Sequence, residues 1–390
     1  MAPSMDLHAL LRAVVDCGGT DLHLKVGMPP VVRRDGSLQA VEGSQPLTEA
    51  DLETVLQSFT AHNPQRLTQF RETGELDTSF MAPDLARFRV NAFKQRGATS
   101  FALRLIPNEI PRFEDLRLPI GVQKMSEEHR GLVLVTGATG SGKSTTLAAL
   151  LGQINRTRRQ HIVTIEDPIE FLHADHGCIV NQREVGLDTE SFQQALRRAL
   201  RQDPDVILIG ELRDAETAQT ALQAAESGHL VFSTLHTVDA AETLGRIIEF
   251  FPGIKQPQIR SILAGVLRGV VSQRLLPRIG GGRVAAFEVM VNNARIADLI
   301  REDKAEEIPD AIAEGAFFHM QTFSQSLIEL VLSGEIDREV AADASTNRHD
   351  FLVSLEHALK RKDAVDREEV ARREAEAQPE PELRVVSPER

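Results

Sequence analysis

The sequence is poor in residues on which several protein classes depend. Its 390 residues include no tryptophan, no tyrosine and only two cysteines, Cys17 and Cys178. Two distant cysteines without CxxC spacing exclude a disulfide scaffold and a cysteine-rich zinc site, and they fit a reducing cytoplasm. Without tryptophan or tyrosine, the chain also lacks the aromatic platforms on which single-stranded nucleic acids stack.

Long apolar segments and an excess of positive charge are also missing. No apolar run reaches the roughly 18 residues that a membrane-spanning helix needs, and residues 1–19 do not resemble a secretory signal. The formal net charge of −13 argues against a general nucleic-acid or anionic-membrane surface, although it leaves room for a local basic channel. We therefore expect a cytoplasmic protein that binds no nucleic acid and reaches a membrane only through a partner.

The residues that are present suffice for two or three folded domains, since 42% are hydrophobic and 26% are charged. Residues 1–106 combine helix patterns with alternating segments typical of an antiparallel sheet, and a helix over residues 47–59 has Thr48 as its expected N-cap. Three prolines within residues 107–119 predict an extended linker that acts as a hinge.

From about residue 120, short apolar runs alternate with helix patterns. Near-continuous apolar runs separated by helices are typical of a parallel sheet that is buried on both faces. We expect this α/β core over residues 120–290, a helical region over 291–362 and a disordered tail over 363–390. The expected strands are 132–137, 161–166, 206–211 and 230–235; helices should begin near Lys143, Ser191, Asp214 and Asp239, and after residue 255 the pattern is mostly helical, with a glycine-rich turn at Gly280–Gly282.

The strongest motif is GATGSGKS at residues 137–144, which matches the phosphate-binding loop GxxxxGK[ST] and lies between a strand pattern and a helix pattern. Its glycines let backbone N–H groups point at phosphate oxygens, Lys143 reaches the β- and γ-phosphates, and the Ser144 hydroxyl ligates Mg²⁺. The alternative is a glycine-rich turn that contains a lysine by chance. The strand and helix patterns on either side of the motif disfavour this alternative. The motif therefore predicts a nucleoside triphosphate site. Kinases, GTPases and motors share this loop, and the NKxD base-reading segment of a GTPase is absent. The candidate binding residues are Gly137, Ala138, Thr139, Gly140, Ser141, Gly142, Lys143, Ser144 and Thr145.

Carboxylates follow two of the apolar runs. Glu166 and Asp167 end one run, and Glu211 follows another. Beside a phosphate-binding loop, such carboxylates can complete the Mg²⁺ shell and orient the attacking water. We assign Glu211 to polarising the water and place Glu166 or Asp167 near the metal. The alternatives are that Glu211 only pairs with Arg213, and that Asp167 only starts an Asp-Pro turn.

Two histidines flank the run at 230–235. His236 directly follows it, where a histidine could donate a hydrogen bond to the γ-phosphate and sense hydrolysis. A strand-edge histidine with a purely structural role is an equal alternative for His236. His229 precedes the run, where the structural role fits better, and it is kept as a further candidate nucleotide-binding residue.

Two arginines of the N-terminal segment could stabilise the charge that develops on a transferred phosphoryl group. Arg89 and Arg104 lie symmetrically about Arg96 and Gly97, so a hairpin that turns there would pair them directly. Like charges opposite each other destabilise a sheet unless an anion satisfies them. A phosphate bound by a neighbouring subunit would do so, and two solvated surface arginines are the alternative.

In combination, these motifs resemble those of the type IV pilus retraction ATPases, the PilT-like branch of the bacterial secretion ATPases. The resemblance covers about residues 5–335. TIEDPIEF is similar to the family's Asp box, DPDVILIGELRD to its atypical Walker B motif, and GHLVFSTLHT to its His box. The segments LIREDK at 299–304 and MQTFSQSL at 320–327 are similar to C-terminal segments of the retraction branch.

The resemblance implies a PAS-like α+β N-terminal domain, a RecA-like P-loop ATPase domain and a helical C-terminal region. It also implies a homo-hexamer that uses ATP and Mg²⁺, with ATP between the two domains of one subunit and with Arg89 and Arg104 closing on the phosphates. The ring would dock on an inner-membrane platform protein from the cytoplasmic side, with a paralogous pilus ATPase as a further partner, and would power pilus retraction and twitching motility. The longer C-terminus and the departure RIADLIRE at 295–302 keep an accessory, PilU-like ATPase or a nucleotide-dependent scaffold as alternatives.

Overall fold

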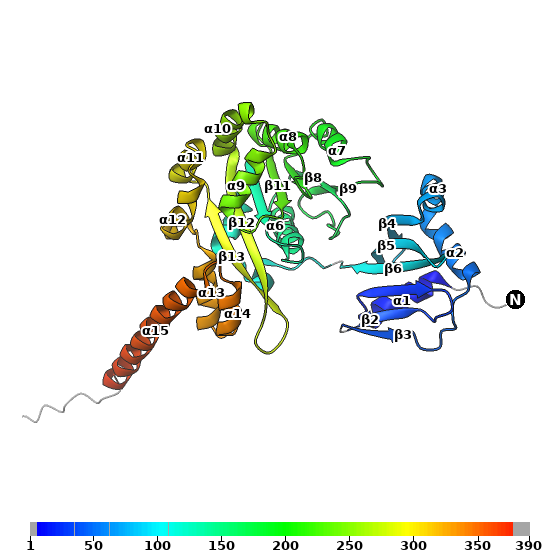
Figure 1. Cartoon of the computed structure of the whole chain (residues 1–390), viewed down its shortest axis with the longest axis horizontal. Coiled ribbons are helices and arrows are strands. Elements are labelled where there is room, and N and C mark those ends of the chain that lie inside the picture. Colours follow the sequence, from blue (N-terminus) through cyan, green and yellow to red (C-terminus); the bar gives the residue numbers. More distant parts are fainter. Residues whose placement is uncertain (1–5, 35, 62, 108, 377–390) are drawn as a thin grey trace, which may run out of the picture.

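Figure 1 shows the computed structural model of the chain, which describes residues 6–34, 36–61, 63–107 and 109–376. An N-terminal domain and a larger α/β core each form a sheet, and helices follow at the C-terminal end. The elements of the N-terminal domain are α1 (Leu7–Asp16), β1 (Asp21–Lys25), β2 (Val31–Arg34), β3 (Ser37–Ala40), α2 (Glu49–Thr60), α3 (Pro64–Thr73), β4 (Glu75–Ala82), β5 (Ala86–Gln95) and β6 (Ala98–Ile106).

The N-terminal domain is an antiparallel sheet covered by helices, with the strand order β3-β2-β1-β6-β5-β4. Side chains alternate along β5, so Phe88 and Val90 enter the core whereas Arg87 and Arg89 lie on the other face. Thr48 and Asp51 form the expected capping box of α2. The sheet and its helices agree with the expected α+β class, and the likeness to a PAS domain stays a prediction.

The core contains a parallel sheet with helices on both faces, as the apolar runs predicted. The strand order is β13-β12-β7-β11-β10-β8-β9, and β7, β10 and β11 are buried along their whole length. The side chains Ser191, Asp214 and Asp239 cap three of the helices, at the starts that the sequence indicated. The elements up to β11 are α4 (Phe113–Leu116), α5 (Ile120–Met125), β7 (Gly131–Thr136), α6 (Lys143–Thr157), β8 (His161–Glu166), β9 (Ile179–Glu184), α7 (Phe192–Ala199), β10 (Val206–Ile209), α8 (Ala215–Glu226) and β11 (Leu230–Leu235).

The segment after residue 255 is less helical than we expected. Strand β12 runs parallel to β7, and β13 returns antiparallel beside it through the glycine-rich turn. The apolar side chains of β12 extend the buried sheet, which explains why this segment does not continue as helix. The remaining elements are α9 (Ala240–Glu249), η1 (Gly253–Lys255), α10 (Gln256–Val266), β12 (Leu267–Pro277), β13 (Arg283–Val291), α11 (Ala294–Arg301), η2 (Ala305–Glu307), α12 (Ile308–Ala313), η3 (Ala316–Phe318), α13 (Phe323–Leu332), α14 (Arg338–Ala344) and α15 (Arg348–Glu376).

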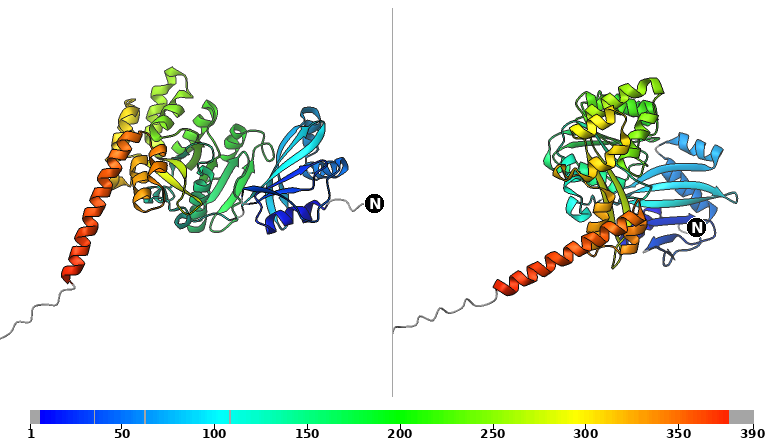
Figure 2. Two further views of the ribbon diagram at one scale, coloured as in Figure 1. Left: turned by 60° about the horizontal axis from the view of Figure 1, so that its bottom comes forward. Right: turned by 60° about the vertical axis from the view of Figure 1, so that its left-hand side comes forward.

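Two boundary predictions differ from the structure. The second half of the 107–119 linker is packed rather than extended, because α4 buries Phe113, and Leu118 follows it into the core. Helix α15 continues to Glu376, past the expected start of a disordered tail at 363, since its glutamate, arginine and alanine residues favour helix. Residues 377–390 of that predicted tail lie outside the described residues. In both views of Figure 2, α15 projects away from the core, to which Phe351 and Leu355 anchor it.

None of the helices in the described part of the chain is long and apolar enough to cross a membrane.

A buried carboxyl group links the end of β13 to the start of α9. The side chain of Glu288 is 9% exposed, and its Oε1 accepts a hydrogen bond of 2.9 Å from the backbone N–H of Ala240. Burial raises the pKa of Glu288 to about 7, the nearby Asp239 adds to this, and the Ala240 N–H and Arg274 oppose it. The folded protein therefore holds a proton here that the unfolded chain releases near pH 4.5.

We expect the free energy of unfolding to fall as the pH rises from 5 to 8, by about 3 kcal/mol from this one group, because the folded state binds the extra proton. Glu288→Gln keeps an acceptor for Ala240 and removes this dependence. Urea unfolding of both proteins at the two pH values measures the difference. Glu249→Gln, an exposed substitution on α9, is the matched control, and an equal effect of Glu288→Gln at both pH values would contradict the prediction.

Candidate functional site

The predicted phosphate-binding loop joins β7 to α6. Gly137 has φ 136° and Gly142 has φ 91°, a left-handed region that disfavours residues with a side chain. A Cβ atom on Gly137 would lie 2.4 Å from the carbonyl oxygen of Gln273, so the close approach of β12 also requires glycine. The Gln273 amide donates a 2.7 Å hydrogen bond to the Ser141 carbonyl. The loop is thus fixed against β12.

Lys143 lies at the start of α6 with its ammonium group inside the loop. Its Nζ donates to the carbonyl oxygens of Gly137, at 2.7 Å, and Ala138, at 3.0 Å. Burial lowers the pKa of Lys143, and the carboxylates of Glu211 and Glu170 oppose this change. The ammonium and the N-terminus of α6 create a positive potential that favours phosphate.

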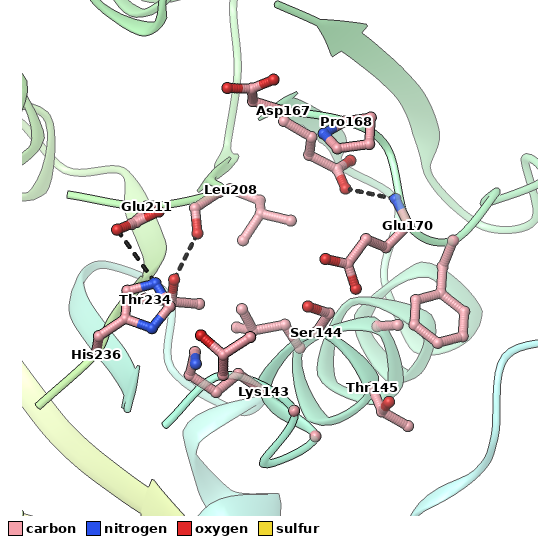
Figure 3. A pocket seen from close by; sticks show the side chains of 18 of the residues that line it. Lys143, Ser144, Thr145, Asp167, Pro168, Glu170, Leu208, Glu211, Thr234 and His236 are labelled. Atoms are coloured by element: carbon pink, nitrogen blue, oxygen red, sulfur yellow. Dashed lines mark hydrogen bonds and ion pairs between the residues drawn. The ribbon is translucent and has the colours of Figure 1, made fainter. Parts of the chain in front are cut away.

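A pocket of about 420 Å³ lies in front of this loop, at the carboxyl ends of β7, β8, β10 and β11 (Figure 3). Ligands of open α/β sheets bind at this edge, and the pocket brings together most of the predicted site residues. Gly137, Ala138 and Ser141 form the loop without lining the pocket. The predicted residues that line it are Thr139, Gly140, Gly142, Lys143, Ser144, Thr145, Glu166, Asp167, Glu211 and His236.

Glu211 lies across the pocket from the loop. Its Oε2 accepts a 2.8 Å hydrogen bond from Nε of Arg213. Its Oε1 lies 3.3 Å from Nε2 of His236 (Figure 3). The pairing with Arg213 that we considered as an alternative is therefore present, and Glu211 nevertheless lines the pocket. The two neighbours hold the carboxylate in one orientation.

The two carboxylates after β8 differ in their surroundings. Oε1 of Glu166 accepts hydrogen bonds from Oγ1 of Thr164, at 2.6 Å, and Nε2 of Gln182, at 3.1 Å. Burial raises the pKa of Glu166 to about 7 despite these bonds. Asp167 is more exposed, and NH1 of Arg213 lies 3.7 Å from its Oδ2. Glu166 is thus engaged by its own sheet, whereas Asp167 has more freedom to meet a ligand.

Sequence reasoning missed two charged residues that line the pocket, Glu170 and Arg283. Figure 3 shows the Glu170 carboxylate between the loop after β8 and Ser144. The Glu170 carboxylate also opposes the lowering of the Lys143 pKa. The TIEDPIEF motif contained this residue, but nothing in its spacing distinguished it from a surface glutamate. Arg283 comes from the start of β13, a segment for which the sequence indicated no site.

The structure does not bring His229 to the pocket, so its assignment as a nucleotide-binding residue needs correction. His229 precedes β11 and lies at the amino end of the strand, whereas the pocket is at the carboxyl end. Its Nδ1 is 2.9 Å from the carbonyl oxygen of Ala224 and 3.1 Å from Oγ of Ser227. These contacts give it a structural role at the end of α8.

Arg89 and Arg104 lie directly opposite each other on β5 and β6, which confirms the predicted register. Arg96 and Gly97 form the turn, with φ 52° and 82°. Nε of Arg104 donates a 2.8 Å hydrogen bond to Oδ1 of Asp21, so this chain itself supplies an anion. Burial would raise the pKa of Asp21, but hydrogen bonds from Arg104 and Thr20 hold it below its usual value.

Neither arginine lines the pocket, and both are exposed. Both therefore lie on an exposed sheet face away from the pocket, and their action on a phosphate stays a prediction. A phosphate from a neighbouring subunit is not required to accommodate their pairing.

A second pocket, of about 470 Å³, adjoins the other side of the loop. Gly142 and Thr145 line both pockets, and apolar side chains such as Leu116 and Phe287 line the second. Arg117 and Arg278 pair with Glu335 at its border, so the linker, the β12–β13 hairpin and the C-terminal helices meet there.

Fold and site together define a P-loop ATPase with a RecA-like core. Residues 84–341 match the family model described as "Type II/IV secretion system protein". The chain belongs to this family of secretion ATPases.

Individual relatives extend the similarity to nearly the whole chain. The type IV pilus retraction ATPase PilT of Pseudomonas aeruginosa is 46% identical over 347 residues, which are 89% of this chain and 100% of that protein. The type IV pilus ATPase PilU of the same species is 42% identical over 90% of this chain and 91% of its own length. The crystal structure of the pilus retraction motor PilT with bound ADP superposes with a TM-score of 0.82, at 44% identity, and covers 89% of this chain and 98% of that one.

Proposed function

We propose that this protein hydrolyses ATP to power type IV pilus retraction, and hence twitching motility. The observation that carries the proposal is the pocket in which Lys143 and Ser144 face Glu211 and His236, in a chain that matches PilT over the full length of that relative. The PilT structure with bound ADP supports a nucleotide in the same loop.

Each pocket residue has a role that its position supports. Lys143 and the loop N–H groups bind the phosphates, Glu211 orients and polarises the attacking water, and His236 holds Glu211 and contacts the γ-phosphate. Arg213 keeps the Glu211 carboxylate in place through their 2.8 Å hydrogen bond.

The site also fits Mg²⁺. This ion binds oxygen ligands and needs only one or two carboxylates besides substrate phosphates. The Ser144 hydroxyl and the carboxylates of Asp167 and Glu170 provide such oxygens, and the described residues contain no denser cluster of His, Cys, Asp and Glu that would indicate another metal. When bound, Mg²⁺ would neutralise charge on the β- and γ-phosphates.

The second pocket offers a place for the rest of the nucleotide. It is continuous with the loop through Gly142 and Thr145, and its apolar wall suits a purine base. The phosphates would then occupy the first pocket and the base the second.

We further propose a homo-hexamer in the cytoplasm that docks on an inner-membrane platform protein. Closure of the N-terminal domain would bring Arg89 and Arg104 to the phosphates of ATP bound by the same chain. A paralogous pilus ATPase would be a further partner, since both PilT and PilU are relatives of this chain.

Deletion of the gene in its own organism tests the proposal, with surface pili and twitching as the readout. Retraction predicts cells with an excess of pili and no twitching, and a plasmid with the parent gene, unlike one with Lys143→Ala, should restore motility. Cells without pili would contradict retraction and indicate extension.

The similarity to PilU favours an accessory ATPase as the second candidate. An accessory protein or a nucleotide-dependent scaffold would leave twitching partly intact after deletion. Purified protein would then show a single turnover of ATP without steady hydrolysis. If the protein is the motor, the purified protein hydrolyses ATP steadily and deletion of its gene abolishes twitching.

A further inference from the structure

A buried carboxylate connects the two domains at the edge of the core sheet. Glu184 is the last residue of β9, and its side chain is only 3% exposed. Its Oε1 accepts a 2.7 Å hydrogen bond from Oγ of Ser79, and its Oε2 accepts one of 2.7 Å from NH2 of Arg87. Both donors belong to the N-terminal domain, on β4 and β5.

A second buried cation completes this contact. Arg66 of α3 donates from NH2 to the carbonyl oxygen of Gly186, in the turn after β9, and from NH1 to Oγ1 of Thr78. Burial lowers the pKa of Arg66, and the carboxylates of Glu184 and Asp188 oppose this change. We call Arg66, Ser79 and Arg87, with Glu184 and Gly186, the interdomain contact.

The same carboxylate also contacts the loop that carries residues of the nucleotide pocket. Oε2 of Glu184, which binds Arg87, accepts a 3.1 Å hydrogen bond from the backbone N–H of Ile169. Ile169 lies between Asp167 and Glu170, which line the pocket. In the sheet register, Glu184 lies opposite Glu166 on β8. One oxygen atom is therefore shared between the N-terminal domain and the loop that carries the pocket carboxylates.

We propose that Glu184 is a positioning residue that couples the docking of the N-terminal domain to the placement of Asp167 and Glu170. A buried carboxylate that loses its arginine is strongly destabilised, so it does not stay in place when the domain moves. When Arg87 withdraws, Glu184 reorients and releases the Ile169 N–H, and the loop carboxylates lose their placement. The inference deepens the proposed function, because placement of these carboxylates matters for ATP hydrolysis.

Hydrogen exchange of the full-length protein tests the coupling independently of ATPase activity. Arg87→Gln lies in a different domain from Ile169, and we expect it to speed exchange of the Ile169 amide about two- to thirtyfold, as does Glu184→Gln. Arg87→Lys, which keeps a cationic donor, should have a smaller effect. Arg71→Gln is the matched control, since it removes only an exposed pairing with Glu53 inside the N-terminal domain.

Steady-state kinetics give a second readout that a purely structural role would not move. We expect Arg87→Gln to lower kcat about two- to thirtyfold and to leave KM for ATP near the parent value, because the phosphate-binding loop is untouched. Arg71→Gln should match the parent in both constants.

The two ideas fail in different ways. A parent protein without ATPase activity would refute the proposed function, and exchange at Ile169 would still decide the coupling. Ile169 exchange that is the same in Arg87→Gln and in the parent would overturn the role of Glu184, as would an unchanged kcat in an active enzyme.

Discussion

Glu211→Gln is expected to bind ATP as tightly as the parent and to hydrolyse it about 10²- to 10⁴-fold more slowly. Glutamine keeps the shape of the side chain, and its amide oxygen can still accept the hydrogen bond from Nε of Arg213. What it loses is the negative charge that polarises a water molecule next to the γ-phosphate. Binding of a fluorescent ATP analogue and release of phosphate measure the two effects separately.

Glu226→Gln provides the control, since it makes the same chemical change at an exposed position at the end of α8. It should leave both binding and turnover unchanged. If Glu211→Gln hydrolysed ATP at the parent rate, the contact with Arg213 would be the whole role of this residue, and the catalytic base would have to be sought among the other carboxylates of the pocket.

Lys143→Ala is expected to weaken ATP binding about 10²- to 10⁴-fold and to reduce hydrolysis below detection. Each charge-assisted hydrogen bond to a phosphate contributes about 1.5–3 kcal/mol, and Lys143 can make two of them. Its ammonium already lies within 3.0 Å of two loop carbonyls, so it reaches phosphates in the loop without a large movement. Calorimetric titration with ATP measures the affinity.

Lys360→Ala on α15 removes a lysine that pairs with Glu356 on the surface, and it should bind ATP like the parent. An affinity of Lys143→Ala within threefold of the parent value would mean that the loop N–H groups alone hold the phosphates. In that case, Lys143 could not have the role proposed for it.

The parts of the fold that depend on local patterns could be predicted from the sequence. The continuous apolar runs indicated buried parallel strands, and the capping side chains Ser191, Asp214 and Asp239 marked where helices begin. Counting about Arg96 and Gly97 also predicted the register that pairs the two arginines. In each case the deciding residues lie within one or two elements of each other.

Contacts between distant segments could not be predicted in this way. Asp21, which accepts a hydrogen bond from Arg104, lies on a strand 83 residues away, and nothing in its sequence context indicated an anion for that arginine. Glu184 ends a polar strand without a motif, and its contact with Arg87 depends on how two domains meet. The error on His229 is different, because the sequence alone could have prevented it. His229 precedes a parallel strand, and such a residue lies at the edge of the sheet opposite to the ligand site.

The N-terminal domain is attached to the core by the chain between β6 and α4 and by the interdomain contact around Glu184. A rigid body that is fastened at two points can only turn about the line that joins them. When one of the two attachments opens, the body can rotate in any direction about the other. Loss of the whole interdomain contact would therefore leave the linker as the remaining attachment. The direction in which the domain moves, and not only the extent of its movement, thus depends on keeping this contact intact.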